Sequence, residues 1–294
     1  MDRYSYEEAY KTASDLLPEG FTLIDKGKNN WVFECGDRIL TIPRHERVKS
    51  YSVRVNATQY LHSKGIPVSE ILEYSLENNK CPEYLLVRRV EGEHINLAKS
   101  TISERESVHG SAGEVLRAIH NLNSQGYGRL KPDLVGENSS WVEFTDKFFA
   151  ESIGRVKRSP DLYSSFGGIL EEEYRMGREN LIDFSLPSFL HADFHLGNLL
   201  FKKGKVSAVL DLDIVSSGDP NWDSGHYCHT FNIDRVNGIR DFRSGYGESH
   251  EEFLERLYCL MVWTRKIGSQ SIQRPEALNE TVPELEKILR GDKI

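Results

Sequence analysis

The chain has 294 residues, of which 38% are hydrophobic and 28% charged, a composition typical of a globular protein that buries a sizeable core. No apolar run approaches the roughly 18 residues that span a membrane, and the polar, acidic start is typical of neither a signal peptide nor a transit peptide. The net charge of −8 comes without a basic stretch, so we expect neither a nucleic acid nor a membrane as a partner.

The placement of charges and cysteines bears on the kind of substrate and on the cellular compartment. Residues 1–90 are neutral overall, whereas 91–294 carries the whole net charge of −8. An acidic second part favours a cationic substrate, although solvated acidic faces also occur without any ligand. The cysteines form no CxxC pair, which indicates free thiols in a reducing compartment and a cytoplasmic location. They are Cys35, Cys81, Cys228 and Cys259.

The first 90 residues are predicted to form a small, sheet-rich lobe. Apolar residues at helical spacing predict a helix over 4–17, which Pro18 and Gly20 end. A second helix is predicted over 50–63. Short strands are predicted at 21–24, 31–34, 38–42 and 84–87, with a hairpin turn at 35–37.

From residue 91 the pattern becomes helical. Ser103 and Glu106 form a capping-box signature before a helix that runs to Leu122, and residues 141–153 predict another helix. A late amphipathic helix is predicted to carry Phe253, Leu254, Leu257, Tyr258, Met261 and Val262 on one side. We therefore expect an α+β protein of two lobes, a small antiparallel-sheet lobe over 1–90 and a mostly helical lobe over 91–294.

Polar residues with a fixed spacing interrupt the apolar stretch 188–213. His191, Asp193 and Asn198 form the pattern H-x-D-x-x-x-x-N, and Asp211 follows 13 residues after Asn198. The runs LLF and VSAVL flank a turn at 202–205 and read as a hairpin, which places Asn198 and Asp211 at the same end. Amide and carboxylate oxygens suit one hard cation, and Asp193 is placed to accept a proton from an attacking hydroxyl.

These are the parts that a phosphoryl-transfer site requires. The alternative interpretation is that Asp193 and Asp211 are turn residues, and that His191 and His195 are loop histidines with satisfied hydrogen bonds. The spacing of the whole set, framed by apolar strands, favours the site.

The segment LHADFHLGNLLF, followed by VLDLD, resembles the catalytic and metal-binding segments of the aminoglycoside phosphotransferase family, a relative of choline kinases and protein kinases. The resemblance implies a bilobal protein-kinase-like fold with Asp193 as the catalytic base. It implies Asn198 and Asp211 as ligands of Mg²⁺, and structural or supporting roles for His191 and His195. It leaves the role of Asp213 open.

Two neighbouring segments extend the resemblance. SGDPNWD (217–223) is similar to the family segment G-D-P-x-x-D, and Asp219 and Pro220 suit the start of a helix, so we expect Asp219 and Asp223 to be structural. YLLVRRVEGEHI resembles the hinge between the two lobes of the family. By that resemblance, the base of ATP or GTP contacts backbone groups around Arg88 to Val90.

The loop that covers the nucleotide phosphates in the family has a counterpart in GKNNWVF. This stretch matches the form G-x-x-N-x-V-F, with Gly27 and Asn30 as the matching positions. A turn of this composition between two strands also forms without a ligand, so the match alone is weak.

The chain departs from the family pattern at one position. Thr41 stands where relatives carry a lysine or arginine that pairs with the phosphates, and basic Arg54 stands near the position of its acidic partner. We therefore expect Arg54 to reach the phosphates, as an arginine can grip them bidentately. Arg38 and Arg44 are alternatives, but each lies an odd number of residues from Thr41 and points to the other face of a regular strand.

The resemblance predicts a magnesium-dependent phosphotransferase that moves the γ-phosphate of ATP or GTP to a hydroxyl of a small molecule. The acceptor resembles an aminoglycoside, macrolide, sugar or aminoalcohol, and the sequence does not choose among them. Residues predicted to line its pocket, or else to belong to the core, are Trp222, Tyr227, Phe231, Asp234 and Glu251. The alternative is a nucleotide-binding pseudokinase with a regulatory role, which the threonine at position 41 favours. No G-x-S-x-G motif points to a hydrolase.

Overall fold

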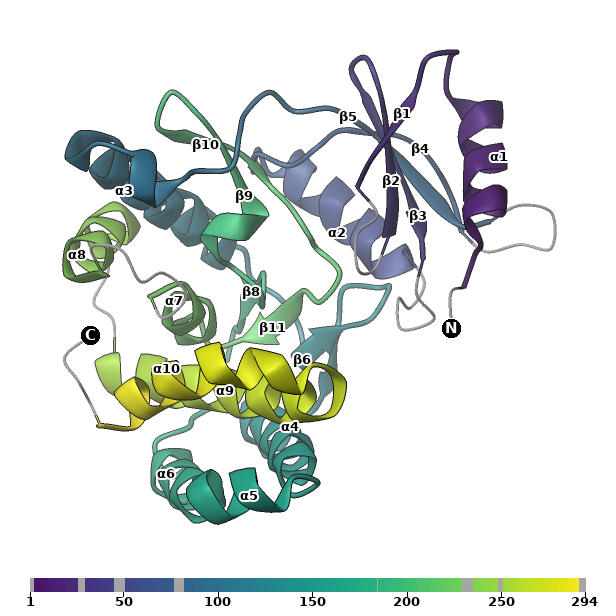
Figure 1. The fold of residues 1–294 in the computed structure, drawn as a ribbon. Coiled ribbons are helices and arrows are strands. Elements are labelled where there is room, and N and C mark those ends of the chain that lie inside the picture. Colours follow the sequence, from purple (N-terminus) through teal and green to yellow (C-terminus); the bar gives the residue numbers. More distant parts are fainter. Residues whose placement is uncertain are drawn as a thin grey trace.

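A computed structural model describes residues 3–25, 30–44, 51–76, 82–183, 185–228, 235–247 and 251–290. The chain folds into two lobes, which confirms the predicted bilobal α+β architecture (Figure 1). No helix in these ranges is both long enough and apolar enough to cross a membrane.

The first lobe is a five-stranded antiparallel sheet with one helix on each face (Figure 1). Its strand order is β1-β2-β3-β5-β4. The strands are β1 (Thr22–Asp25), β2 (Asn30–Cys35), β3 (Arg38–Pro43), β4 (Ile71–Ser75) and β5 (Tyr84–Arg88), and the helices are α1 (Tyr6–Leu16) and α2 (Ser52–Ser63). Both helices and the strands predicted at 21–24, 31–34, 38–42 and 84–87 are confirmed within one or two residues.

Alternation along the strands decides which side chains meet each helix. Leu40, Ile42 and Leu86 pack under α1, whereas Leu85 belongs to a separate cluster with Tyr51 and Val55 beside α2. Successive side chains in a strand point to opposite faces, so Thr41 lies on the α2 side of the sheet. That side faces the second lobe.

Backbone hydrogen bonds join the two lobes. The segment after β5 pairs with the second lobe through Glu93 and Phe201, which exchange N–H···O bonds of 3.0 and 2.9 Å. At a second point between the lobes, Val209 N–H donates to the carbonyl of Pro67 at 2.7 Å. We keep the division at residue 90 as a proposal, since β5 ends at Arg88 and the next helical turn begins at Leu97.

The second lobe is mostly helical. Its helices pack around two clusters of buried apolar side chains, one centred on α3, α7 and α8 and the other on α4, α6, α9 and α10. The helices are α3 (Ile102–His120), α4 (Trp141–Val156), α5 (Pro160–Leu162), α6 (Gly168–Arg178), α7 (Asn221–Cys228), α8 (Arg235–Tyr246), α9 (Glu252–Gln273) and α10 (Leu278–Arg290). Single turns are η1 (Leu97–Lys99), η2 (Tyr163–Gly167), η3 (Leu196–Asn198) and η4 (Pro275–Ala277).

Two small sheets carry the loops of the second lobe. The predicted hairpin is confirmed as β9 (Leu199–Lys202) and β10 (Lys205–Val209). A four-stranded sheet of order β7-β6-β11-β8 was not predicted, because its strands are only three or four residues long and lie far apart in sequence. They are β6 (Tyr127–Leu130), β7 (Gly136–Asn138), β8 (Ser188–Leu190) and β11 (Ser216–Gly218).

Two local predictions in this lobe are wrong. Helix α3 is capped by Thr101 with Glu104, not by Ser103 with Glu106, because Thr101 keeps an extended backbone and its side chain accepts the N–H of Glu104. Both pairs match the same sequence signature, and the first one in the chain starts the helix. In α9, Phe253 does not join the buried face, since its side chain is 48% exposed.

Candidate active site

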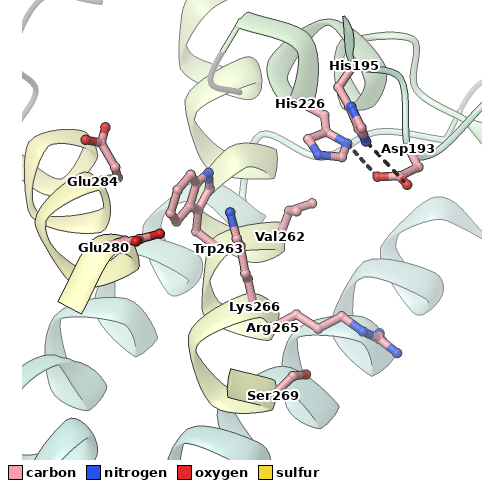
Figure 2. A pocket seen from close by; sticks show the side chains of 10 residues that line it. All are labelled: Asp193, His195, His226, Val262, Trp263, Arg265, Lys266, Ser269, Glu280 and Glu284. Carbon is pink, nitrogen blue, oxygen red and sulfur yellow. Dashed lines mark ion pairs between the residues drawn. The ribbon is translucent and has the colours of Figure 1, made fainter. Parts of the chain in front are cut away.

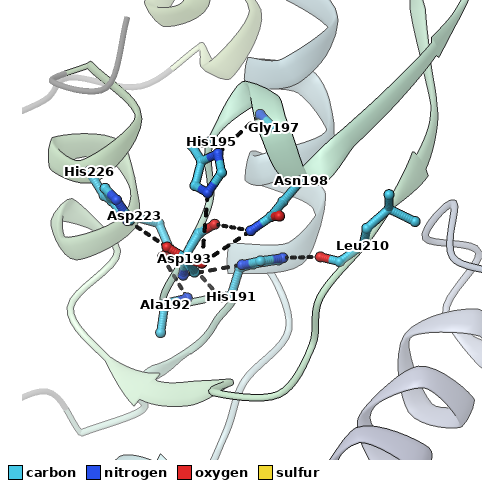
Figure 3. A network of polar contacts seen from close by, with 9 residues as sticks. All are labelled: His191, Ala192, Asp193, His195, Gly197, Asn198, Leu210, Asp223 and His226. Atoms are coloured by element: carbon cyan, nitrogen blue, oxygen red, sulfur yellow. Dashed lines mark hydrogen bonds and ion pairs between the residues drawn. The ribbon is translucent and has the colours of Figure 1, made fainter. Parts of the chain in front are cut away.

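The loop between β8 and η3, residues 191–195, is held by one buried carboxylate. Asp223 in α7 accepts the backbone N–H groups of His191 and Ala192, each at 2.7 Å (Figure 3). Its Oδ2 also lies 3.2 Å from His120 Nε2. Ala192 has φ +66°, a left-handed conformation that is costly for a residue with a Cβ. The hydrogen bonds that Asp223 accepts compensate for this strain and fix the loop. This agrees with the structural role expected for Asp223.

Asp219 has a comparable structural role at the start of α7. Its carboxylate accepts the backbone N–H of Asn221 at 2.9 Å and the hydroxyl of Tyr258 at 2.6 Å. Burial raises the pKa of Asp219, and the hydrogen bonds from Tyr258 and Asn221 act against that rise. The predicted helix-capping function of this residue is confirmed.

His191 ties this loop to the strand that leads to Asp211. Its Nδ1 accepts the backbone N–H of Asp193 at 3.2 Å, so its Nε2 carries the proton and donates to the carbonyl of Leu210 at 2.8 Å (Figure 3). Asp211, the next residue, also has a left-handed backbone, with φ +59°. His191 thus fixes the spacing between the two acidic segments and is in no position to react itself.

Asp193 lies between two imidazoles (Figure 3). His195 Nε2 is 3.7 Å from its Oδ2, and His226 Nδ1 is 3.7 Å from its Oδ1. His195 Nδ1 accepts the N–H of Gly197 at 3.0 Å, so Nε2 carries its proton and faces the carboxylate. Burial acts to raise the pKa of Asp193, but the imidazoles of His195, His226 and His191 near its carboxylate lower it to about 2. Asp193 is therefore an ionised carboxylate at neutral pH.

His226 is a site residue that the sequence analysis missed. It lies in α7, beyond the segments 188–213 and 217–223 that carry the sequence motifs, and no spacing rule connects it to Asp193. Burial lowers its pKa to about 4, so the imidazole beside Asp193 is neutral at pH 7.

The end of the β9–β10 hairpin brings Asn198 and Asp211 together as predicted. Asn198 Nδ2 donates to the backbone carbonyl of Asp193 at 3.0 Å and to its Oδ2 at 3.2 Å, which leaves the amide oxygen Oδ1 for another partner. Leu210 N–H donates to the carbonyl of Asn198 at 2.8 Å. Desolvation by the surrounding protein and the negative charges of Asp213 and Asp193 raise the pKa of Asp211. A cation bound here would relieve that repulsion.

A cavity of about 460 Å³ lies between the lobes and ends at this hairpin. Its walls are mainly apolar, formed by Ile24, Val32, Ile39, Leu85, Val87, Val90, Leu200, Val209 and Leu212. Its polar lining includes Asn30, Thr41, Arg54, Asn198 and Asp211. An apolar slot with a polar end matches the shape and chemistry of a nucleotide.

We call this cavity the cleft cavity. Some of the predicted nucleotide-binding residues line it and others do not. Asn30, Arg54 and Val90 line it. The side chain of Arg88 does not, since it pairs with Asp37 and Glu70 at 2.7 Å each on the outer surface. Gly27 lies outside the described residues.

Thr41 and Arg54 both line the cleft cavity. Thr41 is buried, and its hydroxyl donates to the carbonyl of Leu85 at 3.3 Å. Arg54 Nη1 lies 3.5 Å from Asp213 Oδ1, and its guanidinium lies 5.3 Å from the ring centroid of Tyr51. Burial acts to lower the pKa of Arg54, but the charges of Asp213, Tyr51 and Asp211 raise it. The guanidinium is thus held, charged, beside Asp213 and within reach of the charge of Asp211.

The two alternatives to Arg54 lie elsewhere. Arg38 is exposed at the outer end of β3, and the guanidinium of Arg44 stacks 4.6 Å from the ring centroid of Trp31. Neither lines the cleft cavity.

A second cavity, of about 620 Å³, opens on the other side of Asp193 (Figure 2). We call it the acceptor-side cavity. It is lined by Asp193, His195, His226, Val262, Trp263, Arg265, Lys266, Ser269, Glu280 and Glu284. Asp193 lines this cavity and Asn198 lines the cleft cavity, so the hydrogen bond between the two residues marks the border of the two spaces.

Of the two alternatives given for Trp222 and Tyr227, the structure supports the core, and Glu251 is wrong as a lining residue. Trp222 and Tyr227 are core residues, 3% and 0% exposed, and Glu251 lies at the start of α9. None of the three lines the cavity, and Phe231 and Asp234 lie outside the described residues. The aromatic spacing in this part of the chain belongs to core packing, and the lining comes instead from α9 and α10.

Comparisons with known proteins agree with this geometry. The chain resembles the crystal structure of a thermostable mutant of aminoglycoside phosphotransferase APH(4)-Ia in its apo form, with a TM-score of 0.74 and 17% identity over 97% of this chain and 99% of that one. It also resembles a further variant of that enzyme in a ternary complex with AMP-PNP and hygromycin B (TM-score 0.72, 17% identity, 98% and 99% covered). ADP-bound aminoglycoside phosphotransferase APH(2'')-Ib gives a TM-score of 0.67 at 14% identity, with 97% and 99% covered.

At these identities the solved structures establish the fold, and the family rests on the sequence. No curated protein sequence matches the chain significantly. The sequence pattern of the phosphotransferase enzyme family, APH, matches residues 20–257, most of the chain. The chain therefore belongs to the phosphotransferase enzyme family and is a kinase-type enzyme with a hydroxyl group as its acceptor.

Proposed function

We propose that this protein transfers the γ-phosphoryl group of ATP or GTP to a hydroxyl of a small molecule held in the acceptor-side cavity. The observation that carries the proposal is the position of Asp193. Its carboxylate lies at the border of the two cavities and is hydrogen-bonded to Asn198 of the cleft cavity. A base at such a border contacts a hydroxyl on one side while a phosphate approaches from the other.

The chemical step assigns one function to each group. The acceptor oxygen forms a bond to the γ-phosphorus as the bond from that phosphorus to the β–γ bridging oxygen breaks, and the nucleoside diphosphate leaves. The hydroxyl proton passes to the Asp193 carboxylate, which is ionised at neutral pH. The neutral imidazole of His226 and the Nε2–H of His195 flank that carboxylate and keep it oriented.

The residues beside the cleft cavity suit Mg²⁺. Asn198 has a free amide oxygen, Asp211 carries a raised pKa among other carboxylates, and Asp213 Oδ1 is buried with no hydrogen bond among the described residues. Within the described ranges no three His, Cys, Asp or Glu side chains gather closely enough to form a metal site alone. We therefore assign Asn198 and Asp211 as the protein's share of the ligands, with phosphate oxygens as the rest. Bound there, the ion would neutralise charge on the phosphates.

The nucleotide would lie with its base between the apolar walls of the cleft cavity, against the backbone at Arg88–Val90. Arg54 would supply a positive charge at the polar end, since this chain has Thr41 at the position where relatives carry a basic residue. Asn30, with Gly27 before it, would cover the phosphates. Several related structures have been solved with AMP-PNP or ADP, and three of those contain hygromycin B as well, which supports a nucleotide donor and a hydroxylated acceptor for this chain. The free thiols of Cys35, Cys228 and Cys259 support a cytoplasmic setting.

A nucleotide-binding pseudokinase is the second candidate, and the threonine at position 41 is the observation that favours it. The position of Arg54 weakens that argument, because it supplies a fixed positive charge to the same cavity.

Turnover separates the two candidates. The protein is incubated with Mg²⁺ and either ATP or GTP in the presence of aminoglycosides, macrolides, aminoalcohols, sugars or sugar acids, and products are detected by mass. We expect one phosphorylated acceptor, formed with Mg²⁺ and lost with EDTA. Nucleotide binding without any product across the panel would favour the pseudokinase.

A further inference from the structure

The acceptor-side cavity contains a lysine with no polar partner among the described residues. Lys266 lies on α9, one helical turn after Val262, and its Nζ is 4.1 Å from the ring centroid of Trp263. Figure 2 shows its amine next to the indole, in the space that extends toward His226 and Asp193. A lysine on a protein surface usually extends into water, whereas this one lies over an aromatic ring inside a cavity.

A second cation, Arg265, lies between this cavity and a neighbouring one that is lined by Phe148 and Glu151. Arg265 Nη1 is 3.7 Å from Glu151 Oε2, a long contact to a side chain that is 64% exposed, and its guanidinium lies 4.7 Å from the ring centroid of Phe148. Burial and the positive charges of Arg129 and Arg155 lower its pKa to about 10, so it stays charged at pH 7. The positive charge on this side of the cavity is thus incompletely neutralised by the protein.

Two acidic residues of the cavity come from α10. Burial lowers the pKa of Lys266, and the charge of one of these residues, Glu284, acts to raise it. Glu280 and Glu284 both belong to α10, and Figure 2 shows them beyond Trp263, away from Asp193. Glu284 is already paired with Lys287 at 2.8 Å. Glu280 has no ion pair or hydrogen bond within the described part of the chain. The cavity therefore has a positive side near the catalytic base and one available carboxylate farther away.

We propose that the natural acceptor carries a carboxylate close to its reacting hydroxyl and that Lys266, assisted by Arg265, binds this carboxylate. The inference rests on the proposed function and names the acceptor as a hydroxy acid or a hydroxylated amino acid, including sugar acids. An ammonium group on the acceptor would lie toward Glu280. A polycation such as an aminoglycoside fits this arrangement poorly, because its ammonium groups would approach Lys266 and Arg265 in a partly desolvated space.

The test compares acceptors that differ in a single charged group. Gluconate is paired with glucitol, and serine is compared with ethanolamine, which lacks the carboxylate, and with 3-hydroxypropanoate, which lacks the amine. Kanamycin represents the polycations. Binding is measured by ligand-observed NMR in the presence of Mg²⁺ and a non-hydrolysable ATP analogue, so that the nucleotide site is already filled, and phosphorylation is measured with ATP.

We expect the carboxylate-bearing members to bind at least about tenfold more tightly than their uncharged or cationic counterparts. Lys266→Gln should remove this preference and raise the KM of a phosphorylated acid about tenfold or more, with little change in kcat, since it removes a charge-assisted hydrogen bond. Lys157→Gln is the matched control, because Lys157 pairs with Glu171 on the surface and lines neither cavity. Arg265→Gln should weaken the same preference to a smaller extent.

Several results would overturn the inference. They are equal binding of paired compounds, no binding of any carboxylate, tight binding of kanamycin, or a preference that survives in Lys266→Gln. In the last case Lys266 only packs on Trp263. Failure of the proposed function gives a different pattern, in which no compound is phosphorylated even though nucleotide binds.

Discussion

The two cavities that meet at Asp193 differ in the source of their lining residues. The polar end of the cleft cavity is built largely from one continuous segment, since the hairpin β9–β10 and its flanking residues supply Asn198 and Asp211, with Asp193 at its border. The acceptor-side cavity takes most of its lining from α9 and α10, two helices from the end of the chain. Under the proposed function, the phosphoryl-transfer residues come from a short motif, whereas acceptor choice depends on how distant helices pack.

The variant with the largest expected effect on stability tests the loop of residues 191–195, which lies between the two cavities. Asp223→Ala removes the acceptor of two backbone N–H groups and of His120 in a fully buried position. We expect it to lower the free energy of unfolding by about 3–5 kcal/mol, because two buried backbone N–H groups lose their acceptor, each at a cost of about 1–3 kcal/mol. Urea unfolding at pH 7 measures this, with the exposed Asp133→Ala as a control. A loss below about 1 kcal/mol would mean that the loop holds its shape without Asp223.

A pH titration tests the acceptor side. The folded-state pKa of His226 is about 4, below the ordinary value of 6.5, so the folded protein favours the neutral imidazole. The stability that this contributes is fully present above pH 6.5 and is lost as the pH falls toward 4, by up to about 3 kcal/mol.

The measurement compares unfolding free energies at pH 7 and at a pH of about 4.5. His226→Gln should lose less stability over this interval than the wild type, whereas the exposed His62→Gln should behave like the wild type. Equal losses in all three proteins would show that His226 is not the residue that titrates.

A smaller effect is expected on the cleft side. Arg54→Ala removes the charge held beside Asp213 and should weaken binding of ATP or GTP about tenfold or more, the value of one charge-assisted hydrogen bond. Calorimetry with the nucleotide measures this. Arg38→Ala, at the exposed end of β3, should leave the affinity unchanged. If Arg54→Ala binds nucleotide as tightly as the wild type, the proposed replacement of the missing base at Thr41 is wrong.

The contrast between the cavities also explains how far the sequence alone could predict this protein. The hairpin, the shared end of Asn198 and Asp211, and the structural placement of His191 and Asp223 follow from local spacing, because each depends on neighbours within about 30 residues. His226 could not be found this way, since helix α7 presents it to Asp193 only after folding. The same holds for Lys266 and Glu280, whose significance depends on the packing of α9 against α10.

Local patterns also failed where two interpretations matched equally well. Thr101 and Ser103 both match the sequence pattern of a capping box, and only the conformation of the chain before the helix decides between them. The aromatic residues Trp222 and Tyr227 suited a ligand pocket as well as a core, and the neighbours that bury them come from α4, α8 and α9.

The most direct test of the account is Asp193→Asn, with phosphoryl transfer and nucleotide affinity measured on the same preparation. Because Asp193 lines the acceptor-side cavity and not the cleft cavity, we predict nucleotide affinity close to that of the wild type. Transfer should fall by about 10²–10⁴-fold, the usual contribution of a general base. Transfer at the wild-type rate would contradict the assignment of Asp193 as the base between the two cavities.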